Sequence, residues 1–382
     1  MRPEHVTASL PARLGRSVAL RWLAIAFVIA FAGLRWDATT GFTGLMRFGE
    51  KNAARRLPVL QHLPIADARA YGYDGQFYAQ LAVEPRVTNP DVVNALDKPS
   101  YRARRILLPL LAHALGAGRP WLVLQAYAVL NLVAWLWLAA ELWRLLPATS
   151  WRANAAWLAV LLGVGALDSV RLALTDLPAA LLLVLAARAM ERGHGWRATA
   201  WGLAAGFTRE VSLAGALLLR YREKWSTLAL RATVALPVLL WCGWLAWRLP
   251  GPIGHEGNLD FPGVAFARSL GQNAALIFSG QDDTQRIFGV LGGLALAAQS
   301  WFVFARARAF TSSAWVRLAL PFAVLFWLIG PDPWLDYRAV ARDCLPLTIV
   351  FNLLWARRTE AHPLWLLANL AVVDGVLRFA DL

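Results

Sequence analysis

Long apolar runs alternate with short polar stretches along almost the whole chain. Nine apolar segments can be marked in this way. They are residues 18–34, 121–143, 153–167, 177–190, 228–249, 287–305, 315–330, 344–355 and 363–377. A helix needs about 20 apolar residues to cross a bilayer, and several of these segments are shorter. Short or interrupted apolar segments often line a cavity inside a membrane protein. The pattern predicts an all-α integral membrane protein with many passes.

Arginines in the short loops predict how the chain is oriented in the membrane, because such loops carry more Lys and Arg on the cytoplasmic side. Arg13 and Arg16 precede the first apolar segment and predict a cytoplasmic N-terminus. A signal peptide is the alternative for this start. The run 18–34 has 17 residues and no clear small-residue cleavage site after it, so we interpret it as an uncleaved first span.

The arginine groups all fall on the cytoplasmic side only if two further apolar segments do not cross the membrane as single spans. Residues 106–115 must lie on the external face or dip into it. Residues 198–219 must enter and return as a broken hairpin, interrupted at Thr208-Arg209-Glu210. We therefore expect about nine to eleven membrane helices, the broken hairpin included.

The same scheme predicts one membrane domain, 1–382, with three external loops. The first and largest covers residues 35–105, where we expect amphipathic helices lying in the membrane interface. The smaller loops are 250–286 and 331–343. The last one contains Asp332, Asp336, Tyr337 and Arg338, which we expect to help complete a site.

Composition agrees with a membrane protein: 58% of the residues are hydrophobic and 16% are charged, against about 25% charged in a typical soluble protein. The net charge is +14, which we attribute to arginines that flank membrane spans, with no role for nucleic acid. The two cysteines lie in apolar segments and the six histidines are scattered, so no metal site is predicted. We expect no cofactor; the sequence leaves open whether a divalent metal ion takes part.

The stretch YGYDGQFYAQLA, residues 71–82, places Asp74 beside a glycine in an aromatic cluster. One hypothesis is structural: Asp74 is the N-cap of a helix that begins at Gly75. That helix would have an aromatic face with Tyr78 and a polar face with Gln76, and would lie in the membrane interface. The other hypothesis is that Asp74 takes part in chemistry, and the two can hold together.

Three arginines follow in YRARRILLPLL, residues 101–111, directly before an apolar segment. Arg102, Arg104 and Arg105 are either anchors that reach lipid phosphates or a clamp for a bound phosphate. Arginine forks match phosphate oxygens in geometry and charge.

Asp176, Arg209 and Glu210 stand in apolar surroundings. Ionisable groups at membrane depth are costly unless they are paired or hydrated, so they point to a functional cavity. The alternative is a structural ion pair, for example between Asp176 and Arg209. Asp37 follows the first span and is either a solvated loop acid or part of the same external site.

GYDGQFYAQLA, followed by YRARRILLPLL, then TDLP and TRE, resembles a family of bacterial multi-spanning membrane proteins associated with cell-surface glycopolymer formation. The likeness covers roughly residues 35–215. The architecture is also similar to the GT-C glycosyltransferases, which are membrane enzymes that take a sugar from a polyprenyl-phosphate donor. The resemblance implies a GT-C-like fold in the bacterial inner membrane, with an active face on the periplasmic side. It implies a lipid-linked sugar donor, an envelope glycan or lipid acceptor, and membrane lipids as partners.

The resemblance also implies roles for individual residues. Asp74 would be the general base that deprotonates the acceptor hydroxyl, although GT-C enzymes usually place this acid soon after the first span, where Asp37 stands. Arginines would stabilise the leaving phosphate: Arg102, Arg104, Arg105 and Arg209. Substrate contacts would come from Tyr73, Gln76, Tyr78, Asp176 and Glu210. Two alternatives stay open, a flippase for lipid-linked sugars and a non-catalytic scaffold of envelope polysaccharide assembly.

Overall fold

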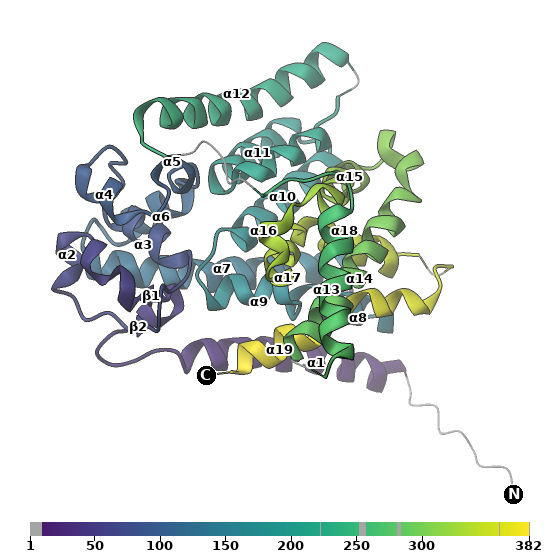
Figure 1. Cartoon of the computed structure of the whole chain (residues 1–382). Helices are drawn as coiled ribbons and strands as arrows, with labels where there is room; N and C mark the ends of the chain where they lie inside the picture. Colours follow the sequence, from purple (N-terminus) through teal and green to yellow (C-terminus); the bar gives the residue numbers. More distant parts are fainter. Residues whose placement is uncertain (1–9, 222, 252–256, 281–283, 359, 382) are drawn as a thin grey trace, which may run out of the picture.

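The computed structural model describes residues 10–221, 223–251, 257–280, 284–358 and 360–381. Part of the predicted loop 250–286, namely residues 252–256 and 281–283, lies outside the described residues. Helices make up most of the fold (Figure 1). The α-helices are α1 (Leu10–Gly33), α2 (Pro58–Gln61), α3 (Gly75–Val83), α4 (Pro90–Ala95), α5 (Pro99–Arg102), α6 (Leu107–Leu115), α7 (Pro120–Leu145), α8 (Trp151–Leu161), α9 (Val164–Arg171), α10 (Asp176–Glu191), α11 (Gly195–Thr208), α12 (Lys224–Arg248), α13 (Val264–Phe278), α14 (Thr284–Phe304), α15 (Ala314–Leu328), α16 (Pro331–Trp334), α17 (Tyr337–Asp343), α18 (Leu345–Ala356) and α19 (Val372–Ala380).

Shorter elements complete the fold. The described residues include the 3-10 helices η1 (Thr43–Met46), η2 (Glu50–Arg55), η3 (Glu210–Leu218), η4 (Ala307–Thr311) and η5 (Pro363–Asn369). Two strands, β1 (Phe48–Gly49) and β2 (Asp67–Ala68), pair in parallel, with Phe48 opposite Asp67. All nine apolar segments predicted from the sequence are largely helical, although residues 153–167 are divided between α8 and α9 and residues 363–377 between η5 and α19.

Helices of membrane-spanning length are fewer than the predicted nine to eleven. Within the described part of the chain, five helices are long and apolar enough to cross a bilayer, or six if α17 and α18, bent by 66° to each other, form one span. Three of the five are α7, α12 and α14. The other two join consecutive elements: α8 with α9 (Trp151–Arg171) and η5 with α19 (Pro363–Ala380). Shorter apolar helices, such as Ala314–Leu328, pack among them. The structure is that of a helical membrane protein with several short internal helices.

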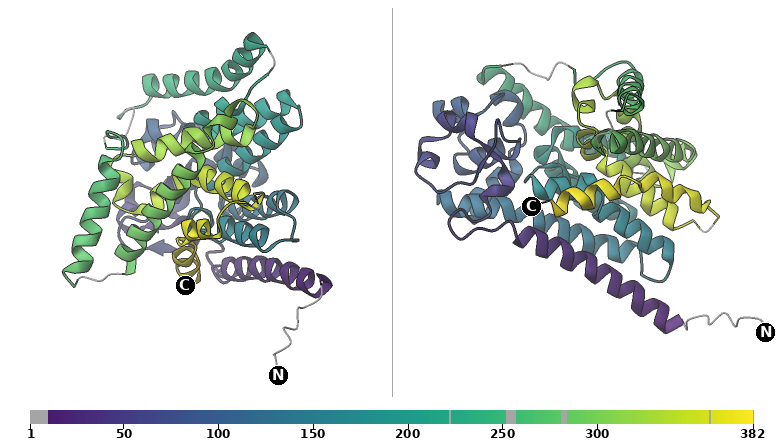
Figure 2. Two further views of the ribbon diagram at one scale, coloured as in Figure 1. Left: turned by 90° about the vertical axis from the view of Figure 1, so that its right-hand side faces the viewer. Right: turned by 60° about the horizontal axis from the view of Figure 1, so that its bottom comes forward.

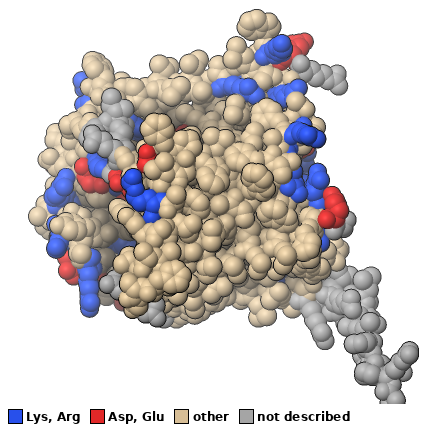
Figure 3. Space-filling model, turned by 45° about the vertical axis from the view of Figure 1, so that its right-hand side comes forward, with Lys and Arg blue, Asp and Glu red and all other residues tan. Residues whose placement is uncertain are grey.

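The outer surface agrees with this conclusion. Figure 3 shows a broad face without charged side chains, and Lys, Arg, Asp and Glu gather toward its opposite edges. Helix α12 lies at the periphery in Figures 1 and 2, and its Trp225, Leu240 and Trp247 side chains are exposed. Apolar side chains turned outward in this way suit contact with lipid rather than water.

The predicted first loop, residues 35–105, folds into a lobe of short elements at one side of the helices (Figures 1 and 2). Helix α3 is its centre and packs against α6 and α7. Every residue of α3 is buried, so the expectation of an amphipathic helix in the membrane interface is wrong for this segment. The aromatic and glutamine side chains that suggested two faces are covered by the rest of the lobe and by α7.

The predicted break at Thr208-Arg209-Glu210 is confirmed. Helix α11 ends at Thr208, Arg209 is extended with φ −158° and ψ 120°, and η3 begins at Glu210. The break releases two charged side chains from the helical repeat and turns the chain back along α11. Such irregular backbone at membrane depth is tolerated where it lines a cavity or is covered by protein.

Candidate functional site

The backbone around Asp74 passes through a space so narrow that it requires glycine on both sides. A Cβ at Gly72, where φ is +71°, would lie 2.1 Å from the carbonyl oxygen of Arg47. A Cβ at Gly75 would lie 2.3 Å from the carbonyl oxygen of Leu172. The two glycines of the GYDG motif thus let the start of α3 press against neighbouring backbone. This close approach fixes the position from which Asp74 projects.

Asp74 is the residue before α3, as the capping hypothesis predicted, but its side chain makes no capping hydrogen bond. Its carboxylate instead accepts from both terminal nitrogens of Arg102, at 2.8 and 2.7 Å. Burial opposes ionisation of Asp74. The Arg102 guanidinium, with Arg105 and Arg342 nearby, nevertheless holds the pKa of this carboxyl below its ordinary value. The Asp74 side chain is 40% exposed.

Arg102 is held from two sides, because Asp97 accepts from its Nε and from one terminal nitrogen, both at 2.8 Å. It also donates to the Tyr78 hydroxyl, at 3.3 Å, and lies over the Phe77 ring. Arg102 is only 7% exposed. The hypothesis that it anchors the protein to lipid headgroups is therefore wrong: its donors are used to orient Asp74.

Arg105 makes a second network beside the first. It donates to both oxygens of Glu210, at 3.0 and 3.1 Å, and to the hydroxyls of Tyr78 and Tyr101, at 2.5 and 2.7 Å. Arg105 is 4% exposed, so it too is not a surface anchor. This pair joins the lobe to the break after α11, 105 residues further along the chain.

A third network lies where the last third of the chain meets the lobe. Arg209 forms ion pairs with Asp176 at the start of α10 and with Asp343 at the end of α17. The predicted pair of Asp176 and Arg209 is thus present. Arg342, next to Asp343, donates to the Tyr73 hydroxyl at 2.7 Å. Burial raises the pKa of Tyr73, so its hydroxyl keeps its proton at neutral pH.

The three networks surround one cavity of about 780 Å³, here called the Asp74 cavity. Its lining residues come from the lobe, the start of α10, the break after α11, the end of α15, and α16 and α17. Its charged lining is balanced, with five arginines and five carboxylates. These are Arg102, Arg104, Arg105, Arg209 and Arg342, with Asp74, Asp176, Glu210, Asp332 and Asp343. Part of the wall is apolar, with Leu259, Leu325 and Ile329. The volume suits a ligand of the size of a glycosyl phosphate.

Most predicted site residues meet at this cavity, but two do not. Gln76 is 1% exposed, accepts from Gly49 N at 3.1 Å and donates to the Tyr71 carbonyl at 2.8 Å. Its amide ties the lobe together and does not line the cavity, so the expected substrate contact is wrong. Asp37 lies elsewhere on the lobe, where its Oδ1 accepts from the backbone of Thr39 and Thr40. These hydrogen bonds lower the pKa of Asp37.

The last external loop contributes differently from what its sequence suggested. Of its four named residues, Asp332 lines the Asp74 cavity. Tyr337 and Arg338 are buried against Asp374 of α19 and hold α17 in place. The loop's main contribution is the pair Arg342 and Asp343, which sequence reasoning missed. No local signal in the sequence marked these two residues.

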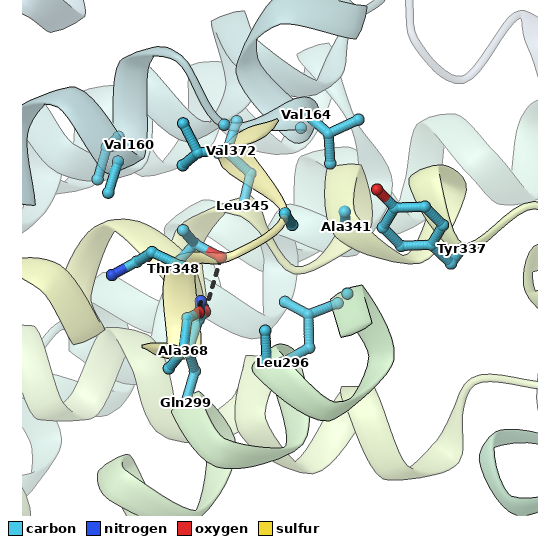
Figure 4. A pocket seen from close by; sticks show the side chains of 17 residues that line it. Val160, Val164, Leu296, Gln299, Tyr337, Ala341, Leu345, Thr348, Ala368 and Val372 are labelled. Carbon is cyan, nitrogen blue, oxygen red and sulfur yellow. Dashed lines mark hydrogen bonds between the residues drawn. The ribbon is translucent and has the colours of Figure 1, made fainter. Parts of the chain in front are cut away.

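A much smaller, mostly apolar cavity lies elsewhere in the helical core and lacks the charged lining of the Asp74 cavity. Figure 4 shows a void of about 30 Å³ among α8, α14, α18 and η5, with Thr348 donating to Gln299 at 2.8 Å. Its walls are mostly apolar and it has room for about one water molecule. Among the described residues, no three His, Cys, Asp or Glu side chains are grouped so as to hold a metal ion.

Comparisons of the chain with profiles of known protein families, with curated proteins and with solved structures each find no match. The resemblance stated above stays a hypothesis that rests on the quoted motifs.

Proposed function

We propose that the protein is a GT-C-like glycosyltransferase of the bacterial inner membrane that moves a sugar from a polyprenyl-phosphate donor to an envelope glycan or lipid acceptor. One observation carries the proposal: a carboxylate with 40% exposed side chain, Asp74, stands in a large cavity and is oriented by a buried arginine. Glu210 and Asp343, which share the cavity, are each only 21% exposed and are paired with arginines.

In the proposed reaction the acceptor hydroxyl donates a hydrogen bond to Asp74. Its oxygen attacks the anomeric carbon while the bond from that carbon to the phosphate oxygen breaks. The phosphate leaves with the electron pair, and the hydroxyl proton passes to Asp74. Arg102 uses only part of the lone-pair capacity of the carboxylate, so each oxygen of Asp74 can still accept from a substrate. The lowered pKa of Asp74 keeps it ionised before the attack.

The arginines have distinct roles in this proposal. Arg102 and Arg105 position the carboxylate and the tyrosines, because their donors are largely used by protein partners. Arg104 is partly exposed and lines the cavity, so it is the best placed of the three to contact the leaving phosphate. Tyr73, which lines the cavity, offers its ring to a sugar. Tyr78 is 1% exposed, and its hydroxyl accepts from Arg102 and Arg105, so it supports these arginines instead. The apolar wall suits the first units of the polyprenyl chain.

The test uses the purified protein in nanodiscs with a panel of polyprenyl-phosphate sugars and an envelope extract. The proposal predicts labelled sugar in the acceptor fraction together with release of polyprenyl phosphate. A flippase would move the intact donor between leaflets without cleaving it. A scaffold would bind the donor and leave it where it was. Donor movement or binding without polyprenyl phosphate release would overturn the enzymatic proposal.

A further inference from the structure

A second polar cavity, of about 520 Å³, lies on the other side of Tyr73, which lines both. We call it the Arg171 cavity. It is formed by the lobe around Arg47 and β2, by the end of α9, and by residues near α17 and α19. Its charged side chains are Arg47, Asp67, Arg69, Asp168, Arg171, Asp336 and Arg378.

The acids of the Arg171 cavity already have partners. Asp67 pairs with Arg56. Asp168 lies 3.5 Å from Arg342 and 3.6 Å from Arg171. The third acid, Asp336, accepts from the backbone of Arg338 and pairs with its side chain.

The arginines of this cavity are not satisfied in the same way. Within the part of the chain that the structure describes, the side chains of Arg47, Arg69 and Arg378 make no hydrogen bond or ion pair. Arg171 is 8% exposed, and its buried Nε has no hydrogen-bond partner. Among the described residues this nitrogen has no acceptor, so it can donate to an anion that enters the cavity.

The local potential is positive as well. Nearby Arg35, which follows α1, has its pKa lowered by burial and by the adjacent Arg47. Four arginines line this cavity against three acids, each of which already contacts an arginine, and this excess of positive charge favours an anionic ligand. Arginine forks bind phosphate oxygens in pairs, which makes phosphate the matching group.

We propose that the Arg171 cavity binds the phosphate or pyrophosphate group of a second ligand, separate from the ligand of the Asp74 cavity. The proposal does not depend on the glycosyltransferase activity. A continuous set of contacts joins the two cavities, since Arg342 touches both Tyr73 and Asp168, and Asp168 touches Arg171. A phosphate bound to Arg171 would compete with Asp168 for that guanidinium. Its effect would pass through Asp168 and Arg342 to Tyr73, which lines the Asp74 cavity.

The experiment measures binding of inorganic pyrophosphate by calorimetry to the full-length protein in uncharged detergent. The variant Arg47→Gln/Arg378→Gln should weaken binding at least tenfold, and it breaks no hydrogen bond or ion pair among the described residues. Arg171 is left in place because it pairs with buried Asp168. The control, Arg119→Gln/Arg268→Gln, removes two exposed arginines outside both cavities and should bind like wild type.

Equal weakening in the control would mean general charge attraction and would overturn the proposal. Weakening by Arg104→Gln, with no effect of Arg47→Gln/Arg378→Gln, would place the anion in the Asp74 cavity and would also overturn it. A second arm compares nanodiscs of phosphatidylcholine with nanodiscs containing phosphatidylglycerol. If the anionic lipid displaces pyrophosphate from the site, the ligand is a lipid headgroup; if it does not, the ligand is a soluble phosphate. Both results support the site.

Discussion

Replacing Arg102 by glutamine is the perturbation whose cost follows most directly from the structure. Arg102→Gln removes the partner of two carboxylates, Asp74 and Asp97. Breaking a fully buried ion pair from one side costs about 3–5 kcal/mol. Here the carboxylates are 40% and 32% exposed, so water compensates in part, and we expect a loss of about 2–3 kcal/mol in the free energy of unfolding.

A double-mutant cycle separates this contribution from general loss of packing. Arg102→Gln, Asp74→Asn and the double variant are unfolded in mixed micelles, with tryptophan fluorescence as the readout. Because Asp74→Asn removes one of the unpaired charges left by Arg102→Gln, the double variant should lose about 1–2 kcal/mol less than the sum of the single losses. Additive losses, or an Arg102→Gln loss no larger than that of the exposed control Arg119→Gln, would refute the pairing described for Asp74.

Two further predictions concern the same segment. Because the pKa of Asp74 is lowered in the folded protein, its ionised form adds stability above about pH 4, and this contribution is lost as the pH falls through the folded-state pKa. The difference in unfolding free energy between wild type and Asp74→Asn should be constant from pH 8 to pH 5 and shrink below pH 4. A change in this difference centred near pH 6 would contradict a lowered pKa of Asp74. Gly75→Ala should reduce thermal stability and transfer activity, because its Cβ would meet the Leu172 carbonyl oxygen, whereas Gly243→Ala in α12, with open space around it, should do neither. Equal midpoints for the two alanine variants would show that the close approach at Gly75 is not required.

Much of the site was predictable because it depends on local signals. The acid between two glycines, the arginines before an apolar segment and the charged break after Thr208 each stand out in the sequence. All three reach the Asp74 cavity. Charged residues in apolar surroundings are costly, so their convergence is what the cost of burial requires.

Long-range contacts were not predictable from these signals. Arg342 reaches Tyr73 across 269 residues, and no local pattern marks that contact. The polar positions of α3 suggested a surface helix, but Gln76 is satisfied by the backbone of the lobe and is buried. Fewer of the described helices reach membrane-spanning length than the sequence suggested, because several apolar segments form helices shorter than a bilayer crossing.

The most direct test of the central claim compares sugar transfer by wild type, Asp74→Asn and Asp37→Asn, with donor binding measured on the same samples. The account predicts that Asp74→Asn binds the donor but transfers no sugar, and that Asp37→Asn transfers it like wild type. Transfer that survives in Asp74→Asn and is lost in Asp37→Asn would contradict the account and assign the base to the residue after the first span.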